Sequence, residues 1–440
     1  MNTPPSLDKL WAVVRDNRDF RRLYSANAIS LLGDWFNVVA LFSLLLELTG
    51  KGEAVAIALL TRFVPSFFAG PAAGVLADRL PRRTILVASD LLRAGLVLCL
   101  LFVRRPDQVW MAYAVVTAHS ILSAFFDPAQ AALLPNLVPL EDYPLAATLE
   151  NSLWSVSLAA GSALGGACIA ALGRDAAFVV DASSFVFSAL LLARLPPVKA
   201  KRLDADAKRL DAIAATIEQE ARAPGNRVEN LLGLRDLREG LRYVATHVRV
   251  RALLAVKAGF GLSLGGVLVL LAYFGEKVFD YGNGVGIATL YTARGVGSFA
   301  GPFAAFWLVG TGDLGLRRSI RWAFALIVVC YCAFALSPHI AWAALALALA
   351  NAGGSILWTS GSTLLQRLVP DEVRGRVAAA EMGAFMLTLT ASTLAVGLLL
   401  DRGIPPRALM AACGLVALFP LAFWASQRRA FEVAIAPSRR

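Results

Sequence analysis

RFVPSFFAGP, at residues 62–71, returns as RGVGSFAGP at residues 294–302. A second stretch, ALLPNLVPLE at residues 132–141, returns as TLLQRLVPDE at residues 363–372. The two stretches keep their order, and both offsets are about 231 residues, just over half of the chain. The repetition predicts a chain built from two similar halves.

The composition is that of a membrane protein. Of the 440 residues, 58% are hydrophobic and 17% are charged, and the mean hydropathy is +0.63. A soluble protein normally carries about 25% charged residues. Apolar runs of roughly 20 residues, enough to cross about 30 Å of hydrocarbon, recur along the chain and lack the alternation of barrel strands. We therefore expect an all-α membrane protein with twelve transmembrane helices in two parallel-repeated six-helix halves, an arrangement in which transporters place a substrate path between the repeats.

The expected spans lie at residues 22–47, 54–77, 84–103, 109–134, 145–172, 176–195, 252–275, 283–309, 319–337, 340–366, 377–400 and 406–426. They divide the chain into a terminal segment (1–21), a first half (22–195), a linker (196–251), a second half (252–426) and a tail (427–440). About 31 of the 42 Lys and Arg residues fall in the termini and the even-numbered loops, so both ends and the linker are expected in the cytoplasm. The net charge of +11 then reflects topology, with anionic lipid as its neighbour and no need for nucleic acid.

The linker contains one amphipathic pattern. Its apolar residues recur three or four apart with arginines between them, at Leu231, Leu234, Leu237, Leu241, Val244 and Val248. The pattern predicts a helix, for which two interpretations remain open. The helix lies on the inner leaflet, or it packs beneath the bundle and ties the halves together.

No sequence signal indicates a cofactor, a metal site or an enzyme. The five cysteines, Cys99, Cys168, Cys330, Cys332 and Cys413, fall in expected spans without zinc or redox spacing. A nucleotide-binding P-loop is missing from the sequence, and no constellation of nucleophile and base is found. The first span is too long for a cleaved signal peptide, so we expect it to remain in the mature protein.

GVLADRLPRRTIL, at residues 74–86, resembles motif A of the major facilitator superfamily. Pro81 replaces a glycine of that motif, and the matching residues are Gly74, Leu76, Asp78, Arg79, Arg82 and Arg83. The resemblance implies the twelve-helix fold of that superfamily. It also implies a cytoplasmic latch for the outward-open state, in which the aspartate faces the start of the eleventh helix.

Three further stretches are similar to the bacterial branch that contains macrolide-efflux and siderophore-export proteins: GDWFNVVAL from residue 33, LLTRFVPSFFAGPAAGVLADR from residue 59 and VPDEVRGRVAAAE from residue 369. AAGSALGGA, at residues 159–167, is similar to the antiporter motif C, with Ser162 in place of a proline. Glycine spacing alone also lets two membrane helices approach closely. The fourth span lacks the arginine of motif B, so the coupling scheme of proton-driven drug exporters does not carry over directly.

Charged residues within the spans are candidates for the mechanism, since a charge at membrane depth needs a partner or a wet cavity. Asp34 lies about 12 residues, or roughly 18 Å, from the cytoplasmic end of the first span. Arg62 lies about 12 Å below the opposite surface, at the same depth. We expect the two to pair, and the pair either breaks on protonation or substrate binding, or is a permanent structural ion pair.

The second half keeps the arginine as Arg294 but has no acid at the position of Asp34. Arg294 then faces the central cavity and binds an anionic group of the substrate, or another helix neutralises it. His119, in the fourth span, is either a proton relay or a hydrogen-bonded packing residue. Lys257 is expected to reach the cytoplasmic surface, and Glu381 to serve the dipole of its own helix.

The remaining candidates are gate and cavity residues. Asp127 and the pair Asp90 and Arg93 are candidate partners of the motif A cluster at the cytoplasmic gate. Aromatic and polar residues of the spans are candidates for lining a cavity: Trp35, Asn37, Asn151, Trp154, Asn351 and Trp358.

These patterns and the resemblance together predict a secondary active transporter of the bacterial inner membrane. The leading hypothesis is a proton-coupled exporter of an amphipathic organic compound such as a drug, macrolide or siderophore, with Asp34 as proton carrier. Two alternatives remain open: an uncoupled facilitator or lysolipid transporter of the same fold, and a non-transporting sensor or scaffold that acts through its basic linker. One chain already contains both halves of the path, so we expect a monomer.

Overall fold

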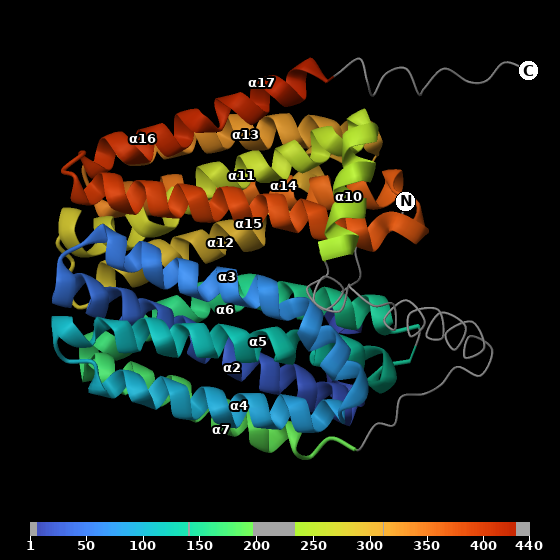
Figure 1. Ribbon diagram of the computed structural model, residues 1–440, viewed down its shortest axis with the longest axis horizontal. Coiled ribbons are helices and arrows are strands. Elements are labelled where there is room, and N and C mark those ends of the chain that lie inside the picture. Colours follow the sequence, from blue (N-terminus) through green and yellow to red (C-terminus); the bar gives the residue numbers. More distant parts are fainter. Residues whose placement is uncertain (1–6, 140, 197–233, 311, 428–440) are drawn as a thin grey trace, which may run out of the picture.

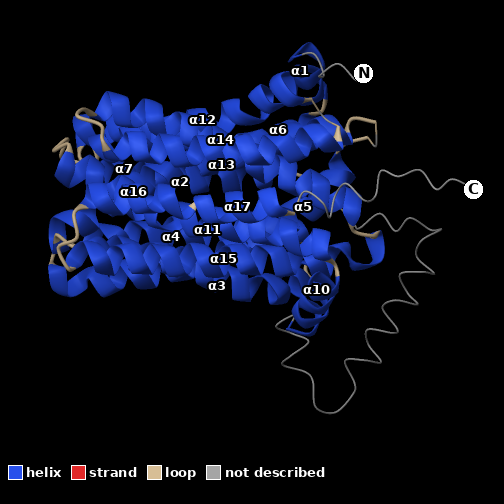
Figure 2. Cartoon of the chain, turned by 90° about the horizontal axis from the view of Figure 1, so that it is seen from above, coloured by secondary structure: helices blue, strands red, loops and turns tan. Residues whose placement is uncertain are grey.

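The computed structural model describes residues 7–139, 141–196, 234–310 and 312–427. The side chains of residues 7–10, 71–72, 74–79, 234–237 and 307–309 lie outside this description. Within the described residues the chain is helical and contains no strand (Figure 2).

Six long helices form the first half of the bundle. They are α2 (Arg18–Thr49), α3 (Gly52–Arg79), α4 (Arg82–Cys99), α5 (Val109–Leu137), α6 (Tyr143–Leu172) and α7 (Arg174–Leu192). Asn17 caps the start of α2, where its side chain accepts hydrogen bonds from the backbone N–H groups of Asp19 and Phe20. Gly50 ends the helix because its φ of 68° is favoured by glycine. The short helix α1 (Leu7–Asp16), which the sequence analysis did not predict, packs against α2 and α6.

The second half repeats this arrangement. Its helices are α11 (Val248–Tyr273), α12 (Val285–Val309), α13 (Asp313–Ala335), α14 (Ile340–Leu368), α15 (Asp371–Asp401), α16 (Pro406–Val416) and α17 (Leu418–Ser426). A π-helical turn, Phe274–Val278, extends α11, and α16 and α17 together form the last span. Eleven helices of the described chain are long and apolar enough to cross a membrane, and α12 completes the twelve. The prediction of an all-α, twelve-helix membrane fold is confirmed.

The halves lie side by side, with α2–α7 forming one block and α11–α17 the other (Figure 1). They meet through two antiparallel helix pairs, α3 with α15 and α6 with α12. Each pair joins the second span of one half to the fifth span of the other. This symmetric interface is what a duplicated half predicts.

The helix α10 (Leu234–Thr246) lies across the ends of spanning helices of the second half and contacts α15 and α11, at the same end of the bundle as the end of α7 (Figure 1). We call this end of the bundle the linker end and the opposite end the far end. A Cβ at Gly240 would lie 2.2 Å from the carbonyl oxygen of Arg376, and Glu239 forms an ion pair with Arg376 at 3.0 Å. The predicted linker helix therefore packs beneath the bundle, against the second half.

Candidate functional site

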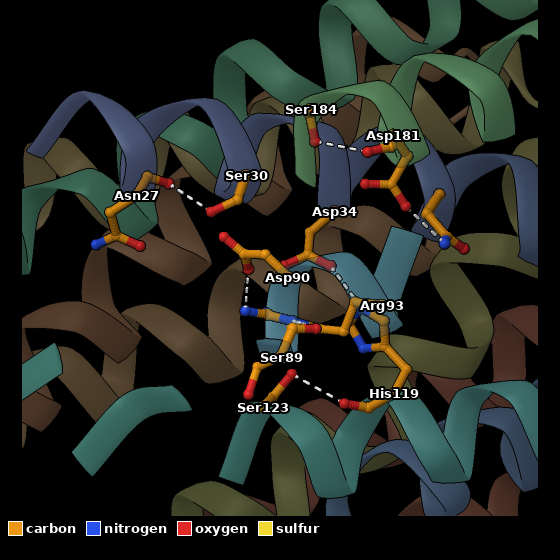
Figure 3. A network of polar contacts seen from close by, with 11 residues as sticks. Asn27, Ser30, Asp34, Ser89, Asp90, Arg93, His119, Ser123, Asp181 and Ser184 are labelled. Carbon is orange, nitrogen blue, oxygen red and sulfur yellow. Dashed lines mark hydrogen bonds and ion pairs between the residues drawn. The ribbon is translucent and has the colours of Figure 1, made fainter. Parts of the chain in front are cut away.

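A cluster of buried polar side chains lies inside the first half, among α2, α4, α5 and α7 (Figure 3). Asp34 of α2 is 9% exposed, and its Oδ1 lies 3.4 Å from Nε2 of His119 on α5. Both residues were predicted as coupling candidates, but not as partners of each other. The structure therefore brings a carboxylate and an imidazole into contact within the first half.

The predicted ion pair between Asp34 and Arg62 is not formed. Within the described residues Arg62 makes no ion pair, and His119 occupies the position beside Asp34. Equal depth in the membrane is not sufficient for an ion pair, because α2 and α3 are not close neighbours. The helix α2 packs mainly against α6 and α7, whereas α3 packs against α5 and α15. Arg62 remains within electrostatic range of His119 and Asp181.

Asp90 and Arg93 of α4 form a buried ion pair. Nη2 of Arg93 donates to Oδ1 of Asp90 at 2.5 Å, and the guanidinium lies 4.3 Å from the ring centre of Phe126 and 4.7 Å from that of Phe185. These residues were predicted to partner the cytoplasmic gate. They lie about 12 to 17 Å into the bundle from the start of α4, so the structure places them in the polar cluster instead.

Asp181 of α7 is a member of the cluster that the sequence analysis missed. Nδ2 of Asn37 donates to its Oδ2 at 2.8 Å, and its Oδ1 is enclosed without a hydrogen-bond partner. Gly33 makes room for these groups, since a Cβ there would lie 2.1 Å from Oγ of Ser184 and 2.7 Å from Oδ1 of Asp181. Asp181 could have been predicted from the sequence, because it is an aspartate inside an expected transmembrane span.

The cluster contains more acid than base. Asp34, Asp90 and Asp181 are all buried, and among the described residues Arg93 is the one guanidinium that pairs with any of them. An ionised carboxylate buried without a partner costs several kcal/mol, and a bound proton removes that cost. Asp127 of α5, another predicted gate residue, is exposed and lies within electrostatic range of Arg93 and Asp34.

A second candidate site lies where α2, α6 and α12 meet. Trp35 is next to Asp34, and its ring centre lies 6.1 Å from that of Trp154 and 6.0 Å from that of Tyr291. The guanidinium carbon of Arg294 lies 5.5 Å from the ring centre of Trp154 and 5.8 Å from that of Tyr291. We call these four residues the Arg294 site. The structure thus brings together three of the residues that the sequence singled out.

The second half has its own buried ion pair. Nζ of Lys257 on α11 donates to Oε2 of Glu381 on α15 at 2.7 Å, and both side chains are 5% exposed. The ammonium also lies 4.3 Å from the ring centre of Trp358, a predicted cavity residue. The prediction that Lys257 reaches the cytoplasmic surface is wrong. Its ammonium stays within the bundle, where it contacts a carboxylate and an aromatic ring.

The other predicted residues lie outside these sites. Nδ2 of Asn351 donates to the carbonyl of Leu347 in its own helix, and Asn151 is exposed. Arg82 donates to the carbonyl of Ala132 at 2.5 Å, and Arg83 to that of Ala193. The side chains of the motif A residues Gly74, Asp78 and Arg79 lie outside the described part of the chain. In that part, no group of three His, Cys, Asp or Glu side chains is arranged to hold a metal ion.

A family model described as Major Facilitator Superfamily matches residues 23–381, most of the chain. The protein belongs to the major facilitator superfamily. It is therefore a multi-pass membrane protein of a transporter family, as the motif A resemblance predicted.

Relatives of this superfamily member include named exporters. Macrolide efflux protein A of Streptococcus pyogenes is 26% identical over 405 residues, which cover 87% of this chain and 88% of that protein. The putative bacilysin exporter BacE of Bacillus subtilis is 23% identical and covers 89% of this chain and 91% of its own length. The MFS-type transporter YfiS of Bacillus subtilis is 30% identical over 183 residues, 41% of this chain. The chain spans about half the length of YfiS and of a second such transporter, YkuC, with 43% and 56% of each matched.

Solved structures share the fold of this superfamily member at low sequence identity. The crystal structure of a POT family transporter in complex with a thioalcohol conjugated peptide matches with a TM-score of 0.68. The two chains are 11% identical, and the match covers 94% of this chain and 96% of that one. At this identity the likeness shows the fold alone.

Two carboxylates that were not predicted from the sequence join the halves of this protein at the far end. Asp401, at the end of α15, accepts hydrogen bonds from the backbone N–H groups of Gly52 (2.8 Å) and Glu53 (3.0 Å) at the start of α3. Glu276 accepts from Oγ of Ser43 at 3.0 Å. Both acids fall one residue beyond the expected spans, where an isolated charge gives no functional signal.

Glycines of the motif C-like segment pack the same interface. A Cβ at Gly166 of α6 would lie 2.3 Å from Cβ of Ala288 on α12, and one at Gly295 would lie 2.4 Å from the backbone nitrogen of Ala159. By contrast, a Cβ at Gly70, toward the linker end of α3, would meet no neighbouring atom within 4 Å. The described glycines that pack against the opposite half thus lie between the middle of the bundle and the far end.

Proposed function

We propose that this protein is a proton-coupled exporter that expels an amphipathic organic compound from the cytoplasm of a bacterium by alternating access. The observation that carries the proposal is the excess of buried acid in the first half, with Asp34 in contact with His119. Protons are the simplest ligands that neutralise such a cluster in a low-dielectric interior.

The position of the cluster links it to a path between the halves. Asp34 is adjacent to Trp35, which belongs to the Arg294 site at the interface of α2, α6 and α12. A change in the protonation of Asp34 therefore occurs one residue from the aromatic surface that would hold a substrate. Rocking of two rigid halves about such a midplane site is the usual motion of parallel-repeat transporters.

Export and orientation are supported by different observations. Relatives named for macrolide efflux and bacilysin export cover most of the chain. The Lys and Arg distribution favours a cytoplasmic linker end, with anionic lipid of the inner leaflet as its neighbour. The far end, where the halves touch, is then the closed external side. Each chain supplies both halves of the path, which supports a monomer.

The test uses purified protein in proteoliposomes with an imposed pH gradient. Gradient dissipation is recorded as macrolides, lipophilic cations, siderophores, organic anions and lysolipids are added, for wild type and Asp34→Asn. Asp175→Asn, which removes an exposed carboxylate that pairs with Arg104, is the matched control. We expect one class to dissipate the gradient in wild type and in the control but not in Asp34→Asn. Flux of a compound without dissipation would instead establish an uncoupled facilitator.

A further inference from the structure

Arg294 is a buried cation without an anion. The residue is 8% exposed, and within the described residues its Nε is enclosed without a hydrogen-bond partner. Within the described residues no carboxylate forms an ion pair with it, and its electrostatic neighbours are the phenols of Tyr291 and Tyr331. A guanidinium stays charged in proteins, so its burial without a counter-ion has a cost that ring contacts offset only in part.

The repeat shows that this environment is specific to the second half. Arg62 occupies the equivalent position in the first half, but Asp181 and the Asp34–His119 pair lie in its surroundings. The two halves have therefore kept the arginine and changed what surrounds it. Acids lie near the first arginine, and aromatic rings surround the second.

The neighbours of Arg294 suit the apolar part of a ligand. Trp154 is 43% exposed although it faces Arg294 across the interface, and Trp35 and Tyr291 form the buried side of the same site. An aromatic or aliphatic body can lie against these rings while an acidic group reaches the guanidinium. The planar fork of an arginine binds carboxylate, sulfonate or phosphate oxygens through two parallel hydrogen bonds.

We propose that the Arg294 site binds an organic anion, a compound with an aromatic or apolar body and one acidic group. This inference names the substrate class of the exporter and rests on the proposed function for its role in transport. The binding step itself stands on Arg294 and its three aromatic neighbours.

The experiment compares two probes that differ in one charged group. The probes are 1-anilinonaphthalene-8-sulfonate and its uncharged parent N-phenyl-1-naphthylamine, added to the full chain in nanodiscs. Energy transfer from the nine tryptophans of the chain reports binding to the protein, the Arg294 variants report whether that binding is at the Arg294 site, and protein-free nanodiscs supply the lipid background. Wild type is compared with Arg294→Gln, Arg294→Lys and Arg104→Gln. Arg104→Gln applies the same substitution to an exposed arginine at the far end.

Wild type and Arg104→Gln are expected to bind the sulfonate at least about tenfold more tightly than the neutral probe, a difference of about 1.4 kcal/mol. Arg294→Gln should lose that preference and keep its affinity for the neutral probe, and Arg294→Lys should keep part of the preference. An unchanged preference in Arg294→Gln would overturn the proposal, as would an equal loss for both probes. Displacement of the sulfonate by excess inorganic sulfate would show a site for small anions and overturn the proposal that the ligand is an organic anion.

The assay remains decisive if one variant folds poorly. Arg294→Lys retains the charge, so its preference for the sulfonate can be measured even where Arg294→Gln elutes as aggregate. Failure here is also distinct from failure of the proposed function, because no gradient is imposed. Anion binding without dissipation of a pH gradient would support the Arg294 site and contradict the proposal of proton coupling.

Discussion

Asp90 and Asp181 are two fully buried aspartates with different partners, and their removal should have different effects. Asp90→Asn removes the ion pair of Arg93 and leaves the guanidinium with the rings of Phe126 and Phe185 and a hydrogen bond of 3.4 Å to the carbonyl of Ser89. Breaking a buried pair from one side costs about 3 kcal/mol or more. Asp181 forms no ion pair within the described residues, and Asp181→Asn preserves a hydrogen bond with Asn37.

Thermal unfolding of the purified variants in one detergent measures this difference. We expect a large drop in the unfolding temperature for Asp90→Asn and a shift of a few degrees at most for Asp181→Asn. Equal losses would mean that the Arg93 contact does not stabilise the first half.

Lys257 and Glu381 allow the same reasoning to be tested by a double-mutant cycle. Lys257→Met leaves the buried carboxylate of Glu381 without its cation, at a cost of about 3 to 5 kcal/mol. Adding Glu381→Gln to that variant removes the uncompensated charge, so most of the lost stability should return. Strict additivity of the two substitutions in denaturation experiments would contradict a coupled pair.

At the scale of residues, the sequence indicates which charged side chains lie inside the bundle better than it indicates what those side chains contact. It selected Asp34, His119 and Arg294, and the structure places all three at buried positions of the two sites or their edge. An ion pair of Asp34 with Arg62 and a surface position for Lys257 were both predicted wrongly. Hydropathy determines how deep a residue lies in the membrane but not how its helix is rotated about its axis. Only packing decides that rotation.

At the scale of helices, the contact between α6 and α12 depends on glycine. Gly295→Ala would place a Cβ 2.4 Å from the backbone nitrogen of Ala159, so the two helices must separate. This contact belongs to the close packing of the halves between the middle of the bundle and the far end, so we expect the substitution to favour conformations with the far end open. Gly70→Ala adds the same methyl group where no atom lies within 4 Å and serves as the control.

Distances between spin labels at positions 107 and 339 report this opening, since both positions are exposed at the far end, one in each half. Longer distances are expected for Gly295→Ala and an unchanged distribution for Gly70→Ala. A distribution for Gly295→Ala that matches wild type would show that the helices accommodate the methyl group without opening.

The pair α3 and α15 is held at the far end by a helix cap. Asp401 ends α15 and accepts two backbone hydrogen bonds at the start of α3, where the helix dipole also favours a negative charge. Motif A implies the reverse arrangement at the other end, with Asp78 at the end of α3 facing the start of α15. Two antiparallel helices would then each carry a terminal aspartate for the other, used in opposite conformations.

Asp401→Ala tests the far-end cap. Loss of an N-terminal cap typically costs about 1 kcal/mol, which is roughly a fivefold change in an equilibrium between two conformations. The labels at positions 107 and 339 should show more of the open far end in Asp401→Ala. Asp175→Ala, which removes a far-end carboxylate that pairs within one half, should behave as wild type. Identical distributions for both variants would exclude a gating role for Asp401.

The spans were the most predictable elements, because length and hydropathy suffice to find a helix that crosses a bilayer. The ends of the spans were less predictable. The helix α2 begins at Arg18, four residues before the expected start, because Asn17 caps it. The helix α1 was not predicted because it is only ten residues long and its apolar and charged residues balance. The linker helix was found from its spacing, but its contact with α15 was not.

At the scale of the whole molecule, the two halves differ in charge. Buried acid is concentrated in the first half around Asp34, and Arg294 presents a buried cation from the second half to the interface. A proton carried inward by the first site and an organic anion carried outward from the second would move positive charge in the same direction. A one-for-one exchange then transfers two elementary charges per cycle.

An inside-negative membrane potential should therefore drive this export without any pH gradient. Each charge contributes about 2.3 kcal/mol per 100 mV, so two charges contribute about 4.6 kcal/mol. Proteoliposomes with the linker end inside, loaded with a transported anion and given a potassium diffusion potential, measure the dependence of efflux on voltage. In Asp34→Asn the proton no longer moves, and the voltage dependence should fall to that of one charge. Efflux from wild type that ignores the potential would mean that the exchanged charges cancel, as they do when the substrate is a cation.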